Sequence, residues 1–107
     1  MDLNEYQKAA ARTSSRPITK LSIAVSAMGL AGEAGEVIDL LKKEIGHGHD
    51  ADPEKLSKEL GDVLWYLSDL ATLHNLSLDD IAQANILKLL KRYPDGFSTE
   101  ASRNRTE

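Results

Sequence analysis

The sequence predicts an all-α domain with a four-helix arrangement, and three observations lead to that prediction. Hydrophobic residues make up 41% of the chain but aromatic residues only 5%, so the core must consist mainly of aliphatic side chains, which favours helices over a β sandwich. Apolar residues recur every three or four positions, and no stretch shows the two-residue alternation of a half-buried strand. Clusters of proline, glycine and short polar residues divide these periodic segments into four pieces.

Length, charge and cysteine content narrow the class of protein. At 107 residues the chain should form one domain, which we place at residues 1–97, followed by a flexible polar tail at residues 98–107. The net charge of −4 gives no electrostatic reason to bind nucleic acid, and the absence of cysteine excludes disulfides and makes a cytoplasmic location the default. The N-terminus does not resemble a signal peptide, and no apolar run approaches the roughly 18 residues of a membrane span, so we expect no membrane partner.

The first two helices are predicted at residues 2–13 and 19–44. Asp2 can cap the first helix, and Leu3, Tyr6 and Ala10 share one of its faces. Pro17 disfavours helical backbone at the residue before it and so ends this helix within residues 13–17. The second helix is long and leads into a glycine-containing loop at residues 46–52.

The third and fourth helices are predicted at residues 53–74 and 78–92. Asp52 is a suitable N-cap for the third helix, with Pro53 at its first helical position. Ser77, followed three residues later by Asp80, resembles a capping box for the fourth helix. The sequence Tyr93-Pro94-Asp95-Gly96 ends that helix. We therefore expect the second and third helices to pack antiparallel at the centre of the domain.

Two pairs of acidic residues lie on the central helices. Glu33 and Glu36 are three residues apart on the second helix, and Glu59 and Asp62 are three residues apart on the third. Both pairs border apolar stripes, and an unpaired carboxylate in such a place is costly. The predicted core face of the third helix consists of Leu56, Leu60, Val63, Leu67 and Leu70. If the helices pack antiparallel, four carboxylates converge, which requires cations, and all-oxygen ligands suit Mg²⁺ or Mn²⁺. Either pair alone would more often be a solvated acidic face.

Four glycines lie inside the predicted central helices, at positions 29, 32, 35 and 61. Each costs roughly 1 kcal/mol of helix stability relative to alanine. Close packing between helices would explain them, and so would the approach of a substrate or metal to the backbone. The sequence leaves both explanations open.

The acidic pairs resemble the E-x-x-E…E-x-x-D signature of the MazG-type nucleotide pyrophosphohydrolases, within the all-α NTP pyrophosphohydrolase superfamily. Gly32-Glu33-Ala34-Gly35-Glu36-Val37 and Glu59-Leu60-Gly61-Asp62-Val63-Leu64 look like the two core blocks of that family. The stretch Asn85 to Tyr93 is similar to its N-x-x-K-[FL]-x-x-R-[FY] block on the last helix. The resemblance covers roughly residues 3–97, and the chain looks like the short stand-alone form.

The resemblance implies a role for each matching position. Glu33, Glu36, Glu59 and Asp62 would hold Mg²⁺, for which Mn²⁺ is a possible substitute, and one of Glu33 and Glu36 would orient or deprotonate the attacking water. Tyr66 would face the phosphates. Asn85, Lys88 and Arg92 would contact the nucleotide, and their spacing places them on one helical face. A basic face near a helix C-terminus is also common without a ligand.

The function implied is Mg-dependent hydrolysis of a nucleoside triphosphate, a (d)NTP, to the monophosphate and pyrophosphate. Two alternatives remain: a superfamily member that acts on a noncanonical or diphosphate nucleotide, and a catalytically silent helical interaction module. We expect a homodimer or homotetramer, because a short helical chain with glycine-rich helix faces and Trp65 has surface to cover. Trp65 itself is more typical of a core or subunit interface than of base stacking. His47 and His49 lie in a glycine loop that is more typical of a solvated surface than of a metal site.

Overall fold

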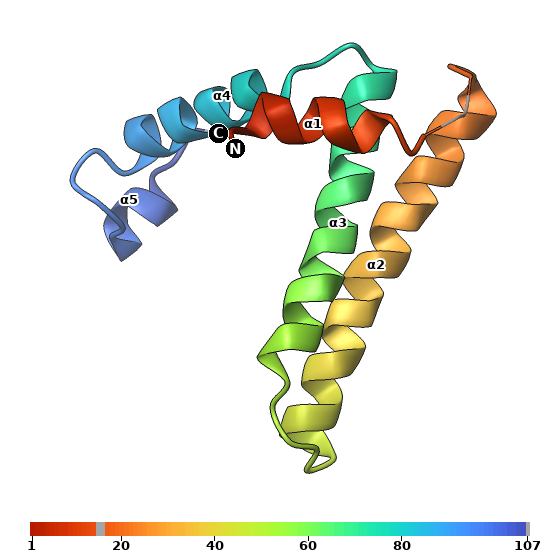
Figure 1. The fold of residues 1–107 in the computed structure, drawn as a ribbon. Helices are drawn as coiled ribbons and strands as arrows, with labels where there is room; N and C mark the ends of the chain where they lie inside the picture. The colour runs from red at the N-terminus through yellow and green to blue at the C-terminus, as the bar shows by residue number, and fades with distance from the viewer. Residues whose placement is uncertain (15–16, 107) are drawn as a thin grey trace.

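The computed structural model describes residues 1–14 and 17–106, and these residues form an all-α fold (Figure 1). Its helices are α1 (Leu3–Ala11), α2 (Lys20–Gly46), α3 (Pro53–Leu73), α4 (Leu78–Arg92) and α5 (Thr99–Arg103). The predicted fold class is confirmed. The first four helices begin and end within two residues of their predicted bounds, and the fifth was not predicted. The predicted helix stop at Pro17 falls partly on residues 15–16, which lie outside the described residues.

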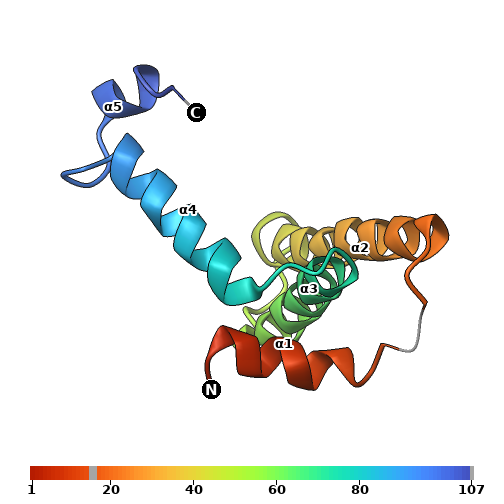
Figure 2. The same ribbon diagram turned by 90° about the horizontal axis from the view of Figure 1, so that it is seen from above.

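The long helices α2 and α3 form an antiparallel hairpin, and α1 crosses it at the end where α3 leads into α4 (Figures 1 and 2). Gln7 on α1 fixes this junction: its Nε2 donates to the carbonyl of Leu76 over 2.8 Å, and its Oε1 accepts from the backbone N–H of Leu78 over 2.8 Å. Beyond the junction α4 contacts α1 and projects away from the hairpin (Figure 2). The single chain is therefore extended: the α2–α3 hairpin and α4 point in different directions from the junction with α1 (Figures 1 and 2).

The N-caps explain where the helices begin. Asp2, Asp52 and Ser77 each accept a hydrogen bond from the backbone N–H three residues later, as predicted. Thr19 and Ser22 form a reciprocal capping box at the start of α2, which the sequence analysis did not single out. Because each cap satisfies N–H groups that the first helical turn leaves free, local sequence sets these boundaries.

The segment expected to be a flexible tail contains helix α5. Ser98 caps it by accepting from the N–H of Ala101 over 3.0 Å. The turn before it is closed by the N–H of Gly96, which donates to the carbonyl of Tyr93 over 3.1 Å. Gly96 has a φ of +87°, which a residue with a side chain rarely adopts. This turn folds α5 back beside the end of α4 (Figures 1 and 2).

The buried core of the single chain is small and partly polar. Its buried apolar residues, among those described, are Ala71, Leu73 and Leu78, and its buried polar residues are Ser22, Ser26, Ser68 and Asp69. The predicted core face of α3 is only partly correct, because Leu60 is 51% exposed and Leu67 is 40% exposed. In a two-helix hairpin, each of the two helices packs against the other along one face. Apolar side chains that point away from that face are therefore left uncovered.

Among the described residues, α2 alone is long and apolar enough to cross a membrane by length and composition, with a mean hydropathy of 1.4 over its most apolar window. The sequence analysis found no sufficiently long apolar run because Glu33 and Glu36 interrupt it. Only 11% of that window is buried in the single chain. A core helix of a water-soluble assembly passes the same test, so this property alone does not indicate a membrane protein.

Candidate metal centre

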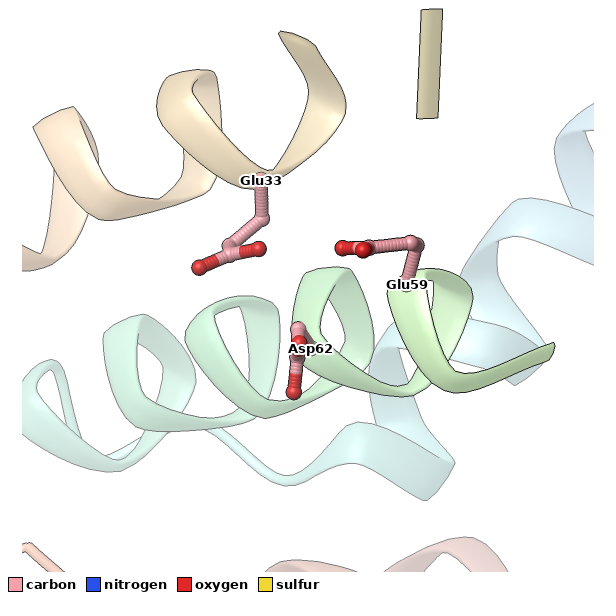
Figure 3. Close-up of side chains that lie close together, drawn as sticks. All are labelled: Glu33, Glu59 and Asp62. Carbon is pink, nitrogen blue, oxygen red and sulfur yellow. The ribbon is translucent and has the colours of Figure 1, made fainter. Parts of the chain in front are cut away.

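Three of the four predicted acidic residues lie close together between α2 and α3. Glu33 on α2 and Glu59 and Asp62 on α3 each offer a carboxylate oxygen, and these three oxygens lie within 4.8 Å of one another (Figure 3). Glu33 and Glu59 are half-buried, and Asp62 is exposed. The group is thus open to solvent on one side, where a ligand can reach it.

The register of the hairpin explains why these residues meet. Ser26 donates a hydrogen bond to the carboxylate of buried Asp69, and Gly29 lies against the ring of Tyr66. From Asp69 to Tyr66 to Asp62 the steps along α3 are three and four residues, and the same steps along α2 lead from Ser26 to Gly29 to Glu33. Equal steps in opposite directions are what antiparallel helices require, so these contacts bring Glu33 opposite Asp62.

Gly29 is needed for this close packing. A Cβ atom at this position would lie 2.1 Å from Cε1 of Tyr66, far inside the usual approach of two carbon atoms. By contrast, a Cβ atom at Gly32, Gly35 or Gly61 would meet nothing within 4 Å in the described part of the chain. Packing inside the chain therefore explains Gly29 and leaves the other three helix glycines unexplained.

The electrostatics of the group fit a cation. Partial removal from water raises the pKa of Glu33, and the charges of Asp62, Glu59 and Glu36 raise this pKa further. Nearby carboxylates of like charge destabilise one another unless a proton or a cation lies between them. Three carboxylates form an all-oxygen donor set, which suits a hard divalent ion such as Mg²⁺.

Glu36 is not part of the three-residue group. The same antiparallel register places it opposite Glu59, and its charge contributes to the raised pKa of Glu33, so it lies at the edge of the group. Its side chain is exposed. The structure thus brings Glu33, Glu59 and Asp62 together and leaves Glu36 beside them.

The family model for the MazG nucleotide pyrophosphohydrolase domain matches residues 23–97. The chain belongs to the MazG family. The match includes both acidic pairs and α4, and it ends before α5. The chain is also similar to the Gene 37 protein of Mycobacterium phage L5, with 37% identity over 82 residues that cover 73% of this chain and 72% of the phage protein. No solved structure gave a significant match.

Two aromatic residues follow Asp62 within one turn or so of α3 in this MazG domain. Tyr66, one turn beyond Asp62, packs against Gly29 and makes an edge-to-face contact with Trp65 at a centroid distance of 5.0 Å. Trp65 donates from Nε1 to Oγ1 of Thr13 over 2.8 Å, so it holds the end of α1 against α3. Trp65 therefore takes part in packing, the more typical role that we expected for it.

The predicted nucleotide-binding residues on α4 are not brought to the acidic group within one chain. Asn85 and Lys88 are exposed, Arg92 is half-buried, and α4 projects away from the hairpin (Figures 1 and 2). The spacing of these three residues places them on one face of α4, but it could not predict how far they lie from the acidic group. The structure therefore leaves their expected contact with the substrate as a prediction.

Tyr6 on α1 interacts electrostatically with Asp62 of the acidic group, which the sequence analysis did not predict. Burial raises the pKa of its hydroxyl, and the charge of Asp62 raises this pKa further, which places Tyr6 beside the acidic group. The only sequence signal was that Tyr6 shares a face of α1 with Leu3 and Ala10. That signal predicts an inward direction but names no partner on α3.

Proposed function

We propose that this MazG domain is a Mg-dependent nucleoside triphosphate pyrophosphohydrolase that converts a (d)NTP to the (d)NMP and pyrophosphate. The observation that carries the proposal is the convergence of Glu33, Glu59 and Asp62 from two facing helices onto one solvent-accessible point. In solution, nucleoside triphosphates are bound to Mg²⁺. A group of carboxylates of this kind binds Mg²⁺ together with the phosphates of the nucleotide.

Glu33, Glu59 and Asp62 would hold Mg²⁺, or Mn²⁺ in its place. The bound ion would polarise the phosphoryl oxygens and lower the pKa of a bound water. In the hydrolysis one water oxygen bonds to phosphorus, the anhydride between the α and β phosphates breaks, and pyrophosphate leaves. Glu36 or Glu33 accepts the proton that the water loses.

We further propose that the protein acts as a homodimer or homotetramer, because the outer face of α2 carries exposed apolar side chains around its glycines. Taking Glu33 as zero, Gly32 and Gly35 lie at about −100° and −160° on the helix, and Met28 and Ile38 lie at about −140° and +140°. Met28 is 64% exposed and Ile38 is 66% exposed. Glycines among apolar side chains permit close approach of another helix, and a second copy of α2 would cover this face.

The same assembly would complete the site. Within one chain, Lys88 and Arg92 are carried away from the acids on α4 (Figure 2). Triphosphate bound at the acids needs cationic partners to offset its remaining charge. A second copy can supply Asn85, Lys88 and Arg92 from its own α4, while Tyr66 borders the phosphates from the hairpin.

Product analysis tests the proposal. The protein would be incubated with each canonical dNTP and NTP in Mg²⁺, and the nucleotide products, pyrophosphate and orthophosphate would be measured. We expect monophosphate and pyrophosphate, with turnover lost in EDTA and in Glu59→Gln. Glu54→Gln is the matched control, because this exposed acid lies in the first turn of α3, outside the acidic group, and is paired with Lys58 over 3.7 Å.

The negative results are equally informative. Mg²⁺ binding without turnover of any canonical nucleotide would replace the proposal with a noncanonical or diphosphate nucleotide substrate. Absence of both turnover and Mg²⁺ binding would identify a helical interaction module that has kept the fold. Equal loss of activity in Glu54→Gln and Glu59→Gln would disprove the placement of the site.

A further inference from the structure

A lysine lies one turn from the acidic group on α3, on the side of the loop that joins α2 and α3. Lys55, Glu59 and Asp62 are spaced four and three residues apart, so they form one stripe along this helix. Lys55 and Glu59 also line the same open groove, whose volume is about 430 Å³. The rise of the helix places Lys55 about 6 Å along the axis from Glu59, a distance that a lysine side chain spans. Lys55 can therefore reach a ligand that is bound at the acidic group.

The neighbouring charges in the first two turns of α3 have partners of their own. Lys58 and Glu54 form an ion pair over 3.7 Å, so their charges offset each other. The carboxylate of Asp52 caps the helix by accepting from the backbone N–H of Lys55 over 3.0 Å. By contrast, the ammonium of Lys55 forms no ion pair within the described part of the chain. Lys55 is thus the cation of this groove whose charge the chain does not offset by direct contact.

The position of Lys55 does not suit a purely structural lysine. It lies in the first turn of α3, where the helix dipole favours acidic residues over cations. A lysine four residues before a glutamate is also the weaker order of an i, i+4 pair. The step from Glu59 to Lys55 is matched on α2 by the step from Glu36 to Leu40, so an uncharged residue lies opposite Lys55. Contacts within the chain therefore leave this cation unexplained, whereas an anion held at the acidic group would explain it.

We propose that Lys55 binds the β and γ phosphates of the nucleotide, and the pyrophosphate that they form, in the same chain as the acidic group. The identity of these phosphates rests on the proposed function. Hydrolysis of the anhydride leaves one further negative charge on the two products. Lys55 offsets the share of this charge that pyrophosphate carries, while its ammonium stays protonated and exchanges no proton. The phosphate chain then extends from the acidic group toward the loop between α2 and α3.

Calorimetric titration of the full-length protein with pyrophosphate in Mg²⁺ tests this role without turnover and for any base preference. Lys55→Gln should weaken pyrophosphate binding about tenfold, the loss expected when one charge-assisted contact is removed. Lys55→Arg keeps the charge and should stay within about threefold of wild type. Titration with Mg²⁺ alone should show that Lys55→Gln binds the ion at least as tightly as wild type, because a nearby positive charge that repels the ion has been removed.

Lys20→Gln is the matched control. It removes the same charge from an exposed lysine at the first residue of α2, at the opposite end of the hairpin from the loop. This variant should change the affinity for pyrophosphate less than about threefold, a loss well below that of a charge-assisted contact. Circular dichroism should show equal helix content in all variants.

Each remaining result separates the role of Lys55 from the proposed function. Equal pyrophosphate affinity in wild type and Lys55→Gln, an equal loss in Lys20→Gln, or no pyrophosphate binding by wild type would overturn the role of Lys55. An equal loss of affinity for Mg²⁺ alone in Lys55→Gln would also overturn it, because the acidic group itself would then be disturbed. If one of these results accompanies nucleotide hydrolysis by wild type, the proposed function stands without Lys55. If the variants behave as expected but wild type hydrolyses no nucleotide, the proposed function fails and pyrophosphate binding by Lys55 stands.

Discussion

Replacing Gly29 by alanine tests the helix register that brings the acidic group of Glu33, Glu59 and Asp62 together. The new Cβ atom would lie 2.1, 2.5 and 2.6 Å from three carbon atoms of the Tyr66 ring. Carbon atoms normally approach to about 3.5–4.0 Å, so the ring must move by roughly 1.4 Å or the helices must separate. Either movement disturbs the contact one turn away from Glu33 and Asp62.

The expected magnitude is a balance of two effects. Overpacking of this kind costs about 1–3 kcal/mol, and a contact this short belongs at the upper end of that range. Replacing a helical glycine by alanine returns about 1 kcal/mol. We therefore expect Gly29→Ala to lower the free energy of unfolding by about 2 kcal/mol, and to lower the melting temperature by about 8–16 °C for a domain of this size.

Thermal and urea unfolding at a fixed protomer concentration would measure this change, and a double-mutant cycle with Tyr66→Ala supplies the control. Without the ring, alanine at position 29 has nothing to strike, so the same substitution should stabilise the Tyr66→Ala protein by about 1 kcal/mol. Wild-type stability in Gly29→Ala, or an equal effect in both backgrounds, would refute the proposed contact and the register derived from it.

The acidic residues give two further predictions, and the outer face of α2 gives a third. Glu36→Gln and Asp62→Asn should keep the helical circular dichroism and remove Mg²⁺-dependent turnover, and wild-type-like rates in both would disprove the assigned site. Glu33→Gln should raise the melting temperature in EDTA at pH 8. Because the pKa of Glu33 is raised in the folded chain, the folded chain binds more protons than the unfolded chain between the ordinary and the raised pKa, and the free energy of unfolding falls as the pH rises through that range. Above the raised pKa the full destabilisation by the charged Glu33 is present, and glutamine removes it. A lower melting temperature in EDTA would contradict that sign. Wild-type protein should scatter light as a dimer or larger species at micromolar concentration, and Gly35→Ala should shift it toward the monomer; a stable wild-type monomer would refute the assembly.

Local signals were sufficient to predict most of the fold. Asp2, Asp52 and Ser77 each cap the helix that they were expected to cap, because an N-cap is decided by a few neighbouring residues. The convergence of Glu33 with Glu59 and Asp62 was also predictable, since an i, i+3 pair on each of two antiparallel helices has few other places to go. The sequence did not predict that Glu36 stands apart from this group.

Long-range placement could not be predicted from local signals. Nothing near Lys88 in the sequence indicates that α4 leaves the hairpin, since that direction is set by the contacts of Gln7 with residues about seventy positions later. The polar composition of the last ten residues concealed α5, whose cap at Ser98 and turn at Gly96 are ordinary structural signals in a segment with few apolar residues. Tyr6 was similarly hidden, because its neighbour Asp62 comes from another helix.

The high mean hydropathy of α2 is explained by the residues on its inner and outer faces. Its inner face carries Ser26, Gly29 and Glu33 against α3, and its outer face carries Met28 and Ile38, which remain exposed in one chain. A helix that also carries apolar side chains outside its packed face reaches a membrane-like mean hydropathy, but two glutamates in the middle of its most apolar stretch would be costly in lipid. In the proposed assembly a second copy of the chain would cover the outer face without burying those carboxylates. Catalysis and assembly would then depend on the same helix, so changes on its outer face should lower activity through the site that the assembly completes.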